Sequence, residues 1–329
     1  MQDKIMVSIS CITYNHENYI ANAIESFLMQ KTDFPYEILI HDDASTDRTP
    51  EIIKQYESKY PDLIKPIYQT ENQYSKRINL EFTYNYSRAK GKYIACCEGD
   101  DYWIDPHKLQ KQVDYLESHP DCTFCFTNGK IVDVKGKQTE RVFIPYSREN
   151  ASYFDNKNRI YKVGELALLG FIPSASFFFR KNSLNNLPEF YYYRFPAEDF
   201  KLKLIVASHG YAYYINDVTC VYRTNVSGSL MTQWKKHNRE QSIQHNQSYI
   251  DLLELIDDHT NYEYSKEFDK VKMSFEFSKF VLMGDKQILK NERYRKYLQE
   301  RGLKYKTKLY ISLYFPKVYT ALKRIIKRR

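Results

Sequence analysis

The sequence predicts an α/β fold, with a mostly parallel sheet flanked by helices and a helical C-terminal region. Segments rich in β-branched residues alternate with segments of helical periodicity from residue 6 to residue 127, which is typical of a parallel sheet covered on both faces. Acidic clusters directly follow two of the strand-like segments, and the pattern from Trp234 onward is mainly helical. We therefore expect an α/β domain at 1–230 and a helical region at 231–329.

The alternating part predicts each element in turn. Thr49 and Pro50 suit the start of a helix, and Gly91 suits the position just after a helix at 78–89. Apolar residues recur every three or four positions after Asn15 and after Pro106, which predicts amphipathic helices there. Strands are expected at 6–13, 36–41, 64–69, 93–97 and 122–127.

The alternation decays after residue 128. The polar stretch 146–160 is expected to form a loop. Helices are expected at 163–169 and 198–208, and strands at 175–179, 211–215 and 218–223. In the C-terminal region, a turn at 257–261 is expected to separate two helical stretches.

The net charge of +8 is concentrated at the C-terminus. Residues 301–329 carry ten Lys and Arg and no acid, whereas the rest of the chain holds 39 basic and 41 acidic groups. This distribution argues against a nucleic-acid-binding surface over the fold. Apolar residues recur along the tail opposite the basic ones, so the tail is expected to bind an anionic membrane surface. Alternatively, it forms a helix that packs back on the α/β domain with a solvated basic face.

The cysteine pattern and the hydropathy suggest where the chain works. The pair Cys122 and Cys125 lies in an apolar strand, and no second pair completes a zinc site. We see neither a signal-peptide pattern nor an apolar stretch near the ~18 residues that would cross a membrane. We therefore expect a cytoplasmic protein with reduced thiols, held peripherally on the inner face of the cell membrane.

Two acidic clusters fall at the carboxyl ends of predicted strands. Glu98, Asp100 and Asp101 follow the fourth strand, and Asp42 and Asp43 end the second. Such an edge of an open α/β sheet is where ligands bind. Carboxylate oxygens suit Mg²⁺ or Mn²⁺, and one carboxylate of the second strand could accept a hydrogen bond from a base or a ribose. The alternative for the cluster after the fourth strand is a solvated acidic loop, and the alternative for Asp42 and Asp43 is a helix cap. Asp47 can supply that cap equally well, which leaves Asp42 and Asp43 freer to bind a ligand.

A third acidic pair, Glu198 and Asp199, stands at the predicted start of a helix. One of them could be a general base that deprotonates an acceptor hydroxyl. The alternative is that both residues only complement the helix N-terminus, where acids are favourable for electrostatic reasons.

Four motifs in order give the sequence a family resemblance. They are Val-Ser-Ile-Ser-Cys-Ile-Thr-Tyr-Asn-His, His-Asp-Asp-Ala-Ser-Thr-Asp, Cys-Glu-Gly-Asp-Asp-Tyr-Trp and Ala-Glu-Asp. In this order the chain resembles family 2 inverting glycosyltransferases with the GT-A fold, of the bacterial surface-polysaccharide type. The resemblance extends from about residue 5 to about residue 225.

The resemblance implies a nucleotide-sugar site at the ends of the first two strands. Thr13, Tyr14 and Asp43 would hold the nucleobase. Asp42 and Glu98 would lie near the base or the ribose. Glutamate at position 98 departs from the more frequent aspartate, and its longer side chain is expected to preserve the site with a different metal preference.

The resemblance also implies the catalytic groups. Asp100, with Asp101, would coordinate Mn²⁺ or Mg²⁺ bridging the diphosphate, and Asp199 would act as the base with Glu198 beside it. Arg223 would be a phosphate ligand. Two residues later, where histidine is common in the family, this chain has Asn225.

The expected function is transfer of a sugar from a nucleotide-sugar, a UDP-sugar by resemblance, to an acceptor hydroxyl with inversion. The acceptor would be a saccharide or lipid-linked saccharide in polysaccharide assembly. Two alternatives remain open. A nucleotidyltransferase would need a Gly-rich, Lys- or Arg-containing loop after the first strand, and residues 14–18 are not one. A non-catalytic sugar-nucleotide-binding module would need neither Asp199 nor Arg223.

Overall fold

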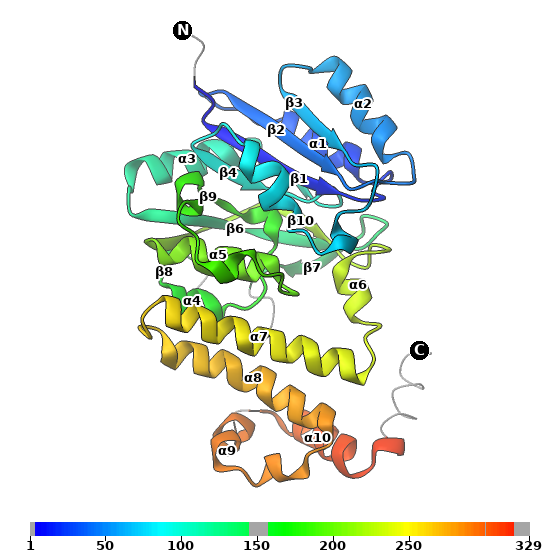
Figure 1. The fold of residues 1–329 in the computed structure, drawn as a ribbon, viewed down its shortest axis with the longest axis vertical. Helices are drawn as coiled ribbons and strands as arrows, with labels where there is room; N and C mark the ends of the chain where they lie inside the picture. Colours follow the sequence, from blue (N-terminus) through cyan, green and yellow to red (C-terminus); the bar gives the residue numbers. More distant parts are fainter. Residues whose placement is uncertain (1–3, 145–156, 300, 319–329) are drawn as a thin grey trace. The chain divides into compact units, whose positions relative to one another are not determined.

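The computed structural model describes residues 4–144, 157–299 and 301–318. The chain divides into two compact units, Met1–Thr232 and Gln233–Arg329. Most of the predicted loop 146–160 and the last part of the basic tail lie outside the described residues. Unit 1 contains the sheet, and unit 2 is helical (Figure 1).

One half of the sheet in unit 1 is parallel, as predicted. The strands lie in the order β3-β2-β1-β4, and Val7 of β1 is opposite Tyr36 of β2 on one side and Tyr93 of β4 on the other. All four strands therefore end at the same edge. Their bounds are β1 Val7–Thr13, β2 Tyr36–Asp42, β3 Ile64–Tyr68 and β4 Tyr93–Cys96.

The other half makes the sheet mixed. The short strand β9 (Phe178–Arg180) pairs antiparallel with β4 and with β6 (Cys122–Val132), between which it lies (Figure 1). β10 (Tyr211–Arg223) runs parallel to β6 and antiparallel to β5 (Tyr102–Trp103). The α/β class is confirmed, while the predicted parallel arrangement holds for β3-β2-β1-β4 and β6-β10. A short apolar run carries no information on strand direction, and β5 and the flanking β7 (Gln138–Val142) and β8 (Arg159–Tyr161) were not predicted.

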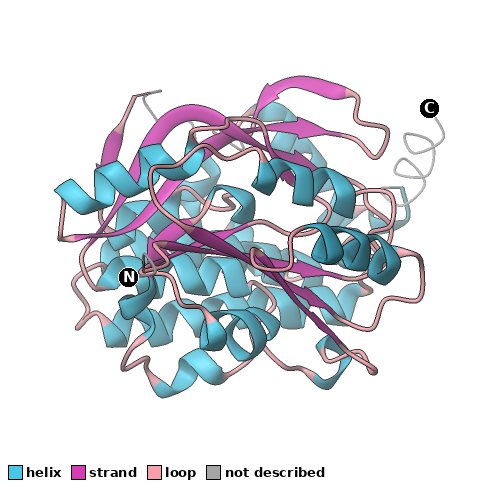
Figure 2. Ribbon diagram, turned by 90° about the horizontal axis from the view of Figure 1, so that it is seen from above, coloured by secondary structure: helices cyan, strands magenta, loops and turns pink. Residues whose placement is uncertain are grey.

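The helices of unit 1 follow the predicted positions in most places. In Figure 2 the strands, drawn in magenta, turn progressively across the sheet, as right-handed strand twist requires. The helices are α1 Ile20–Leu28, α2 Thr49–Lys59, α3 Lys108–Ser118, α4 Val163–Leu168 and α5 Glu198–Ser208, with the short α6 Leu230–Trp234 after them.

Two predicted elements have a different form. The predicted helix 78–89 is a π-helical turn, η2 (Glu81–Asn85), followed by a 3₁₀ turn, η3 (Tyr86–Arg88). The buried Asn85 amide donates to the carbonyls of Cys11 and Leu39, which ties this irregular turn to the sheet. The strands predicted at 211–215 and 218–223 are one strand, β10, with register irregularities between Ile215 and Cys220.

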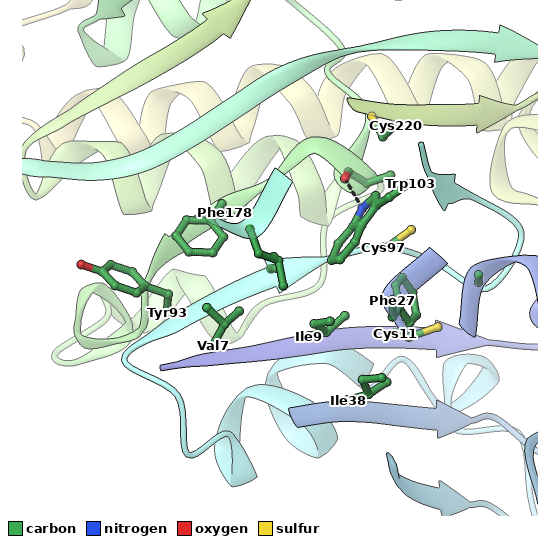
Figure 3. Packing of buried hydrophobic residues seen from close by; sticks show 14 of the residues in the cluster. Val7, Ile9, Cys11, Phe27, Ile38, Tyr93, Cys97, Trp103, Phe178 and Cys220 are labelled. Carbon is green, nitrogen blue, oxygen red and sulfur yellow. Dashed lines mark hydrogen bonds between the residues drawn. The ribbon is translucent and has the colours of Figure 1, made fainter. Parts of the chain in front are cut away.

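Apolar side chains of the parallel strands, α1 and β9 form the core of unit 1 (Figure 3). Phe27 meets the Trp103 ring edge-on, and the indole nitrogen of Trp103 donates to the Ala175 carbonyl at 2.8 Å. This bond satisfies the polar atom of a fully buried side chain. All six cysteines are buried and free, including Cys122 and Cys125 of β6.

Unit 2 is a set of helices with its own small core. Asn238 caps α7 by accepting from the Gln241 backbone N–H, and Gly284 ends α8 with φ of 75°. The predicted turn between them is confirmed by a connection that includes Asn261 at φ 51°. The elements are α7 Arg239–His259, α8 Ser265–Met283, η8 Lys286–Leu289, α9 Glu292–Gln299 and α10 Leu303–Tyr314.

The described part of the basic tail contributes two leucines to this core. Leu309 and Leu313 of α10 are buried against Phe277, Ile288 and Tyr294. These two leucines therefore belong to a packed helix, as the alternative expected, but the residues they pack on are in unit 2 and not in the α/β domain. The tail beyond residue 318 is outside the described residues. Within the described ranges, no helix is long and apolar enough to cross a membrane.

Candidate active site

The loops that follow β1 and β2 are joined to each other by hydrogen bonds. The backbone N–H of Asn15 donates to Ser45 Oγ at 2.8 Å, and Asn15 Oδ1 accepts from the Thr46 N–H at 2.8 Å. The N–H of His16 donates to Thr49 Oγ1, also at 2.8 Å. Asn15 has φ of 55°, a conformation that asparagine tolerates better than most residues. Two of the sequence motifs thus form one layer at the carboxyl edge of the sheet.

Thr13 and Tyr14 lie at the end of β1 beside this layer. The Thr13 side chain is buried, and its hydroxyl is 3.1 Å from His16 Nδ1. A Cβ atom on Gly99 would lie 2.5 Å from Thr13 Oγ1, so only glycine lets the acidic loop approach this closely. Tyr14 is 42% exposed, which leaves its ring free to stack on a planar ligand.

Asp42 and Asp43, both buried, already accept hydrogen bonds from protein groups. Asp42 accepts from the Ser45 hydroxyl and, at 3.3 Å, from the Ser45 N–H. Asp43 accepts from the backbone N–H groups of Gln73 at 2.7 Å and Tyr74 at 3.0 Å. Burial raises the pKa of Asp42, and the two bonds from Ser45 oppose that rise. Both carboxylates therefore hold loops in place, which the sequence pattern did not indicate.

The acidic cluster Glu98, Asp100 and Asp101 lies directly after β4, beside the end of β1. Glu98 accepts from the Ser174 hydroxyl at 3.0 Å, and Asp100 Oδ2 is 3.9 Å from His16 Nε2. Asp100 and Asp101 are 7% and 3% exposed. The cluster is therefore an enclosed group of carboxylates and does not form a solvated surface loop.

Burial, and after it repulsion between the carboxylates, raises the pKa values of Glu98 and Asp101. Burial raises the pKa of Glu98 to about 8, with Asp100 as the next cause. Burial, Asp100 and Glu98 raise the pKa of Asp101 well above its usual value. A cation beside the cluster would lower these pKa values by relieving the repulsion.

The cluster fits a hard divalent cation by its chemistry. Within the described ranges, no three His, Cys, Asp or Glu side chains converge to hold a metal ion by themselves. Mg²⁺-like ions are commonly held by one or two carboxylates together with substrate phosphates. Asp100 and Asp101 suit that incomplete ligand set, with a diphosphate supplying the remaining oxygens.

Arg223, at the end of β10, is bound to the acidic loop. Its backbone N–H donates to Asp101 Oδ1 at 2.8 Å, and its Nε donates to the Asp100 carbonyl at 2.9 Å. The guanidinium lies over the rings of Tyr19 and Tyr102, with centroids 4.6 and 5.5 Å away. These contacts bring Arg223 of β10 to carboxylates that follow β4, which is three places away in the strand order.

Glu198 and Asp199 begin α5, and the structure distinguishes them. One Glu198 oxygen accepts from the Phe195 N–H at 2.7 Å, and the other accepts from Asn79 Nδ2 at 2.9 Å and pairs with Lys201 at 2.7 Å. Among the described residues Asp199 has no side-chain partner within hydrogen-bonding distance, and the donors to its carboxylate are the backbone N–H groups of Phe200 and of Asp199 itself. Its carboxylate is therefore the freer of the two to meet a ligand.

The structure adds residues to the site that the sequence patterns did not single out. His16 lies in the first motif, and its approach to Asp100 could have been suspected from that position. Ser174 lies in a 3₁₀ turn, and Asn79 and the half-buried Glu81 lie in the segment 78–89, where the predicted regular helix did not form. Burial raises the pKa of Glu81 to about 7, with Glu198 and Asp199 contributing.

A sheet of parallel strands with ligand-binding groups at their carboxyl ends is characteristic of nucleotide-binding α/β proteins. A model of the family "Glycosyl transferase family 2" matches residues 8–187, more than half of the chain. The chain therefore belongs to glycosyl transferase family 2. This membership favours a glycosyltransferase over the nucleotidyltransferase alternative.

Curated relatives match the first part of the chain. An uncharacterized protein of Mycobacterium tuberculosis is 48% identical over 126 residues, which are 38% of this chain and 36% of that protein. The protein named teichuronic acid biosynthesis glycosyltransferase TuaG, of Bacillus subtilis, is 33% identical over 155 residues, 46% of this chain and 57% of that protein. The matches thus span about a third to just over half of these relatives' length.

Solved structures show that the fold is GT-A. S. aureus TarS in complex with UDP-GlcNAc superimposes with a TM-score of 0.60 at 16% identity, covering 94% of this chain and 79% of that one. The mannosyltransferase PcManGT from Pyrobaculum calidifontis, in complex with GDP-Man and Mn²⁺, gives a TM-score of 0.53 at 16% identity, with 96% and 89% covered. The predicted GT-A fold is confirmed by these two likenesses.

Proposed function

We propose that this chain is a metal-dependent, inverting glycosyltransferase that moves a sugar from a nucleotide-sugar to an acceptor hydroxyl. Family membership supports the transferase class. The observation that supports the chemistry most is the enclosed cluster of Glu98, Asp100 and Asp101 beside β1, within electrostatic range of Asp199. The proposed chemistry needs carboxylates in two roles. The cluster would hold a metal beside the diphosphate leaving group, and Asp199 would accept the proton of the acceptor hydroxyl.

In the proposed reaction, Asp199 accepts the proton of the acceptor hydroxyl as the oxygen attacks the anomeric carbon. A single displacement inverts that carbon. Asp100, with Asp101, would hold Mn²⁺ or Mg²⁺, which would supply positive charge to the departing nucleotide diphosphate. Arg223, already fixed against the acidic loop, would donate to a phosphate oxygen.

The nucleoside is proposed to bind over the joined loops after β1 and β2. Tyr14 would stack on the base, and Thr13 and Glu98 would line the ribose side. Asp42 and Asp43 would support this nucleoside site indirectly, by holding Ser45 and residues 73–74 in place. A UDP-sugar donor is supported by the likeness to TarS, which was crystallised with UDP-GlcNAc.

The domains and the cellular setting are part of the same proposal. Residues 1–230 would form the catalytic domain, and residues 231–329 a helical region ending in the basic tail. The acceptor would be a saccharide or lipid-linked saccharide of a cell-surface polysaccharide, as TuaG's name suggests for that relative. The protein would work in the cytoplasm, at the inner face of the cell membrane.

Nucleotide and nucleotide-sugar binding tests the donor class. The melting temperature is expected to rise with UDP or a UDP-sugar, and to rise further when Mn²⁺ is present. A ligand at 100 times its Kd stabilises the folded protein by ~2.7 kcal/mol, which a thermal-shift assay detects. GDP-sugars and Mn²⁺ alone are the controls. No response to any nucleotide would contradict the proposal, and binding without turnover on any acceptor would indicate a non-catalytic binding module.

Removal of residues 315–329 tests the proposed membrane contact. This segment starts after the buried Leu309 and Leu313 and includes six Lys and Arg, so the deletion leaves the described core of unit 2 intact. Each basic residue near an anionic surface contributes about 1 kcal/mol. The full chain is expected to sediment with anionic vesicles, and the deleted chain to stay in the supernatant.

Two controls accompany this sedimentation assay. High salt should partly reproduce the deletion, because it screens a charge-driven contact. A full-length variant with the six basic residues replaced by glutamine separates charge from the apolar part of the segment. A wild-type chain that never sediments with anionic vesicles would refute the membrane contact.

A further inference from the structure

Helix α5 carries two buried lysines whose ammonium groups have different surroundings. Lys201 and Lys203 are each 1% exposed. Lys201 Nζ donates to the carbonyls of Tyr191 at 2.6 Å and Tyr193 at 2.8 Å, and it pairs with Glu198 at 2.7 Å. The charge of Lys201 is therefore compensated locally, and its carboxylate partner is Glu198.

Lys203 has no such partner. Its ammonium donates to the Gly170 carbonyl and lies 4.7 Å from the centre of the Phe200 ring. Among the described residues it has no carboxylate within ion-pair distance. The acid that acts on it electrostatically is Asp199, one turn earlier on the same face of the helix. Burial lowers the pKa of Lys203 to about 7, and Asp199 opposes this change.

Three acids act on Asp199 electrostatically. Glu198 is its neighbour on α5, Glu81 lies on η2, and Glu98 follows β4, and each interacts with it electrostatically. Burial raises the pKa of Asp199, and the Lys203 ammonium is the largest influence that lowers it. Hydrogen bonds from the backbone N–H groups of Phe200 and Asp199 also lower the Asp199 pKa. Without the Lys203 cation, only these two bonds would oppose burial and the three carboxylates, which favour the protonated form of Asp199, and that form cannot accept a proton.

We propose that Lys203 is a positioning residue that keeps the Asp199 carboxylate ionised for its role as the base. The inference rests on the proposed function. The Gly170 carbonyl, which accepts from Lys203, begins the segment that leads to Ser174, whose hydroxyl donates to Glu98. Lys203 thereby connects the base on α5 with the loop that contacts the acidic cluster on the donor side.

The variant Lys203→Met tests this role. Methionine is unbranched and apolar and fills a similar space, and it removes the cost of burying an ammonium group that has no carboxylate within ion-pair distance. Loss of the cation should raise the pKa of Asp199. The acidic limb of the transfer rate against pH should therefore move to higher pH by about one unit, while the rate on the alkaline side recovers. Below the limb, a one-unit shift is about a tenfold loss of rate.

A direct titration makes the test independent of activity. The side-chain carboxyl carbon of Asp199 is followed by ¹³C NMR against pH in the wild-type and Lys203→Met chains, and its resonance is assigned by its loss in Asp199→Asn. A higher Asp199 pKa in Lys203→Met supports the inference. The same titration curve in both chains overturns it, whatever the transfer rate.

Two further variants separate this role from packing. Lys203→Arg keeps the charge and should keep the limb near its wild-type position. Lys201→Met removes the neighbouring buried lysine and should lower the melting temperature without moving the limb. A limb that moves in Lys201→Met and not in Lys203→Met would overturn the inference and point to Glu198 as the base. A wild-type chain that transfers no sugar would contradict the proposed function, and the NMR titration would still decide the coupling of Lys203 to Asp199.

Discussion

Replacement of Asp199 by asparagine is expected to reduce sugar transfer by roughly 10²–10⁴-fold, the usual contribution of a general base. The amide cannot accept the proton of the acceptor hydroxyl. A base acts in the transition state and need not touch the nucleotide, so donor affinity should remain nearly unchanged. The measurements are the transfer rate at saturating donor and the Kd for the nucleotide in the same preparation.

The outcome distinguishes catalysis from helix capping. Asparagine caps a helix about as well as aspartate, so a capping role alone predicts a variant with wild-type activity and melting temperature. Glu198→Gln is the matched control. It weakens the pair with the buried Lys201, so it should lower the melting temperature and cost less in rate. Wild-type turnover in Asp199→Asn would move the assignment of the base to Glu198.

Replacement of Asp100 by asparagine is expected to abolish the metal-dependent part of donor binding. A neutral amide is a poor ligand for a hard divalent cation, and Asp100 is the carboxylate beside His16 and the end of β1. Calorimetry of UDP with and without Mn²⁺ should show a strong metal effect for the wild-type chain and little or none for the variant.

The control for Asp100→Asn is Asp217→Asn. Asp217 pairs with Lys111 on the surface, away from the acidic cluster, and its loss should leave the metal effect intact. The melting temperature of both variants without ligand shows whether each is folded. Unchanged metal-dependent affinity in a folded Asp100→Asn chain would refute the metal assignment.

The order of the main elements and the edge at which the site lies could be predicted from the sequence alone. Hydrophobic periodicity is a local property, so the strands at 6–13, 36–41 and 93–97 could be recognised from their own residues. Parallel strands end at one edge, so acids placed directly after two of them were expected to approach each other. The acidic cluster after β4 has that position, beside Thr13 and His16.

Which of the acidic side chains already bind other protein groups became known only from the three-dimensional structure. Their position at a helix start does not distinguish Glu198 from Asp199, and only the family resemblance assigned the base to Asp199. In the structure, Asn79 and Lys201 bind Glu198, while Lys203 acts on Asp199. Asn79 comes from an irregular segment 119 residues before Glu198, and Lys201 lies on the buried face of α5. Neither position has a periodic signal of its own.

The same distinction applies to strand direction and to the tail. The antiparallel insertion of β9 depends on the hydrogen-bonding edges that β4 and β6 present, which no short run of apolar residues records. Leu309 and Leu313 have the spacing of a membrane-facing helix in the sequence, yet Phe277 and Ile288 cover them in the structure. Periodicity identifies the apolar face of a helix, while only the three-dimensional packing decides what that face contacts, because burial by protein and burial by lipid select the same side chains.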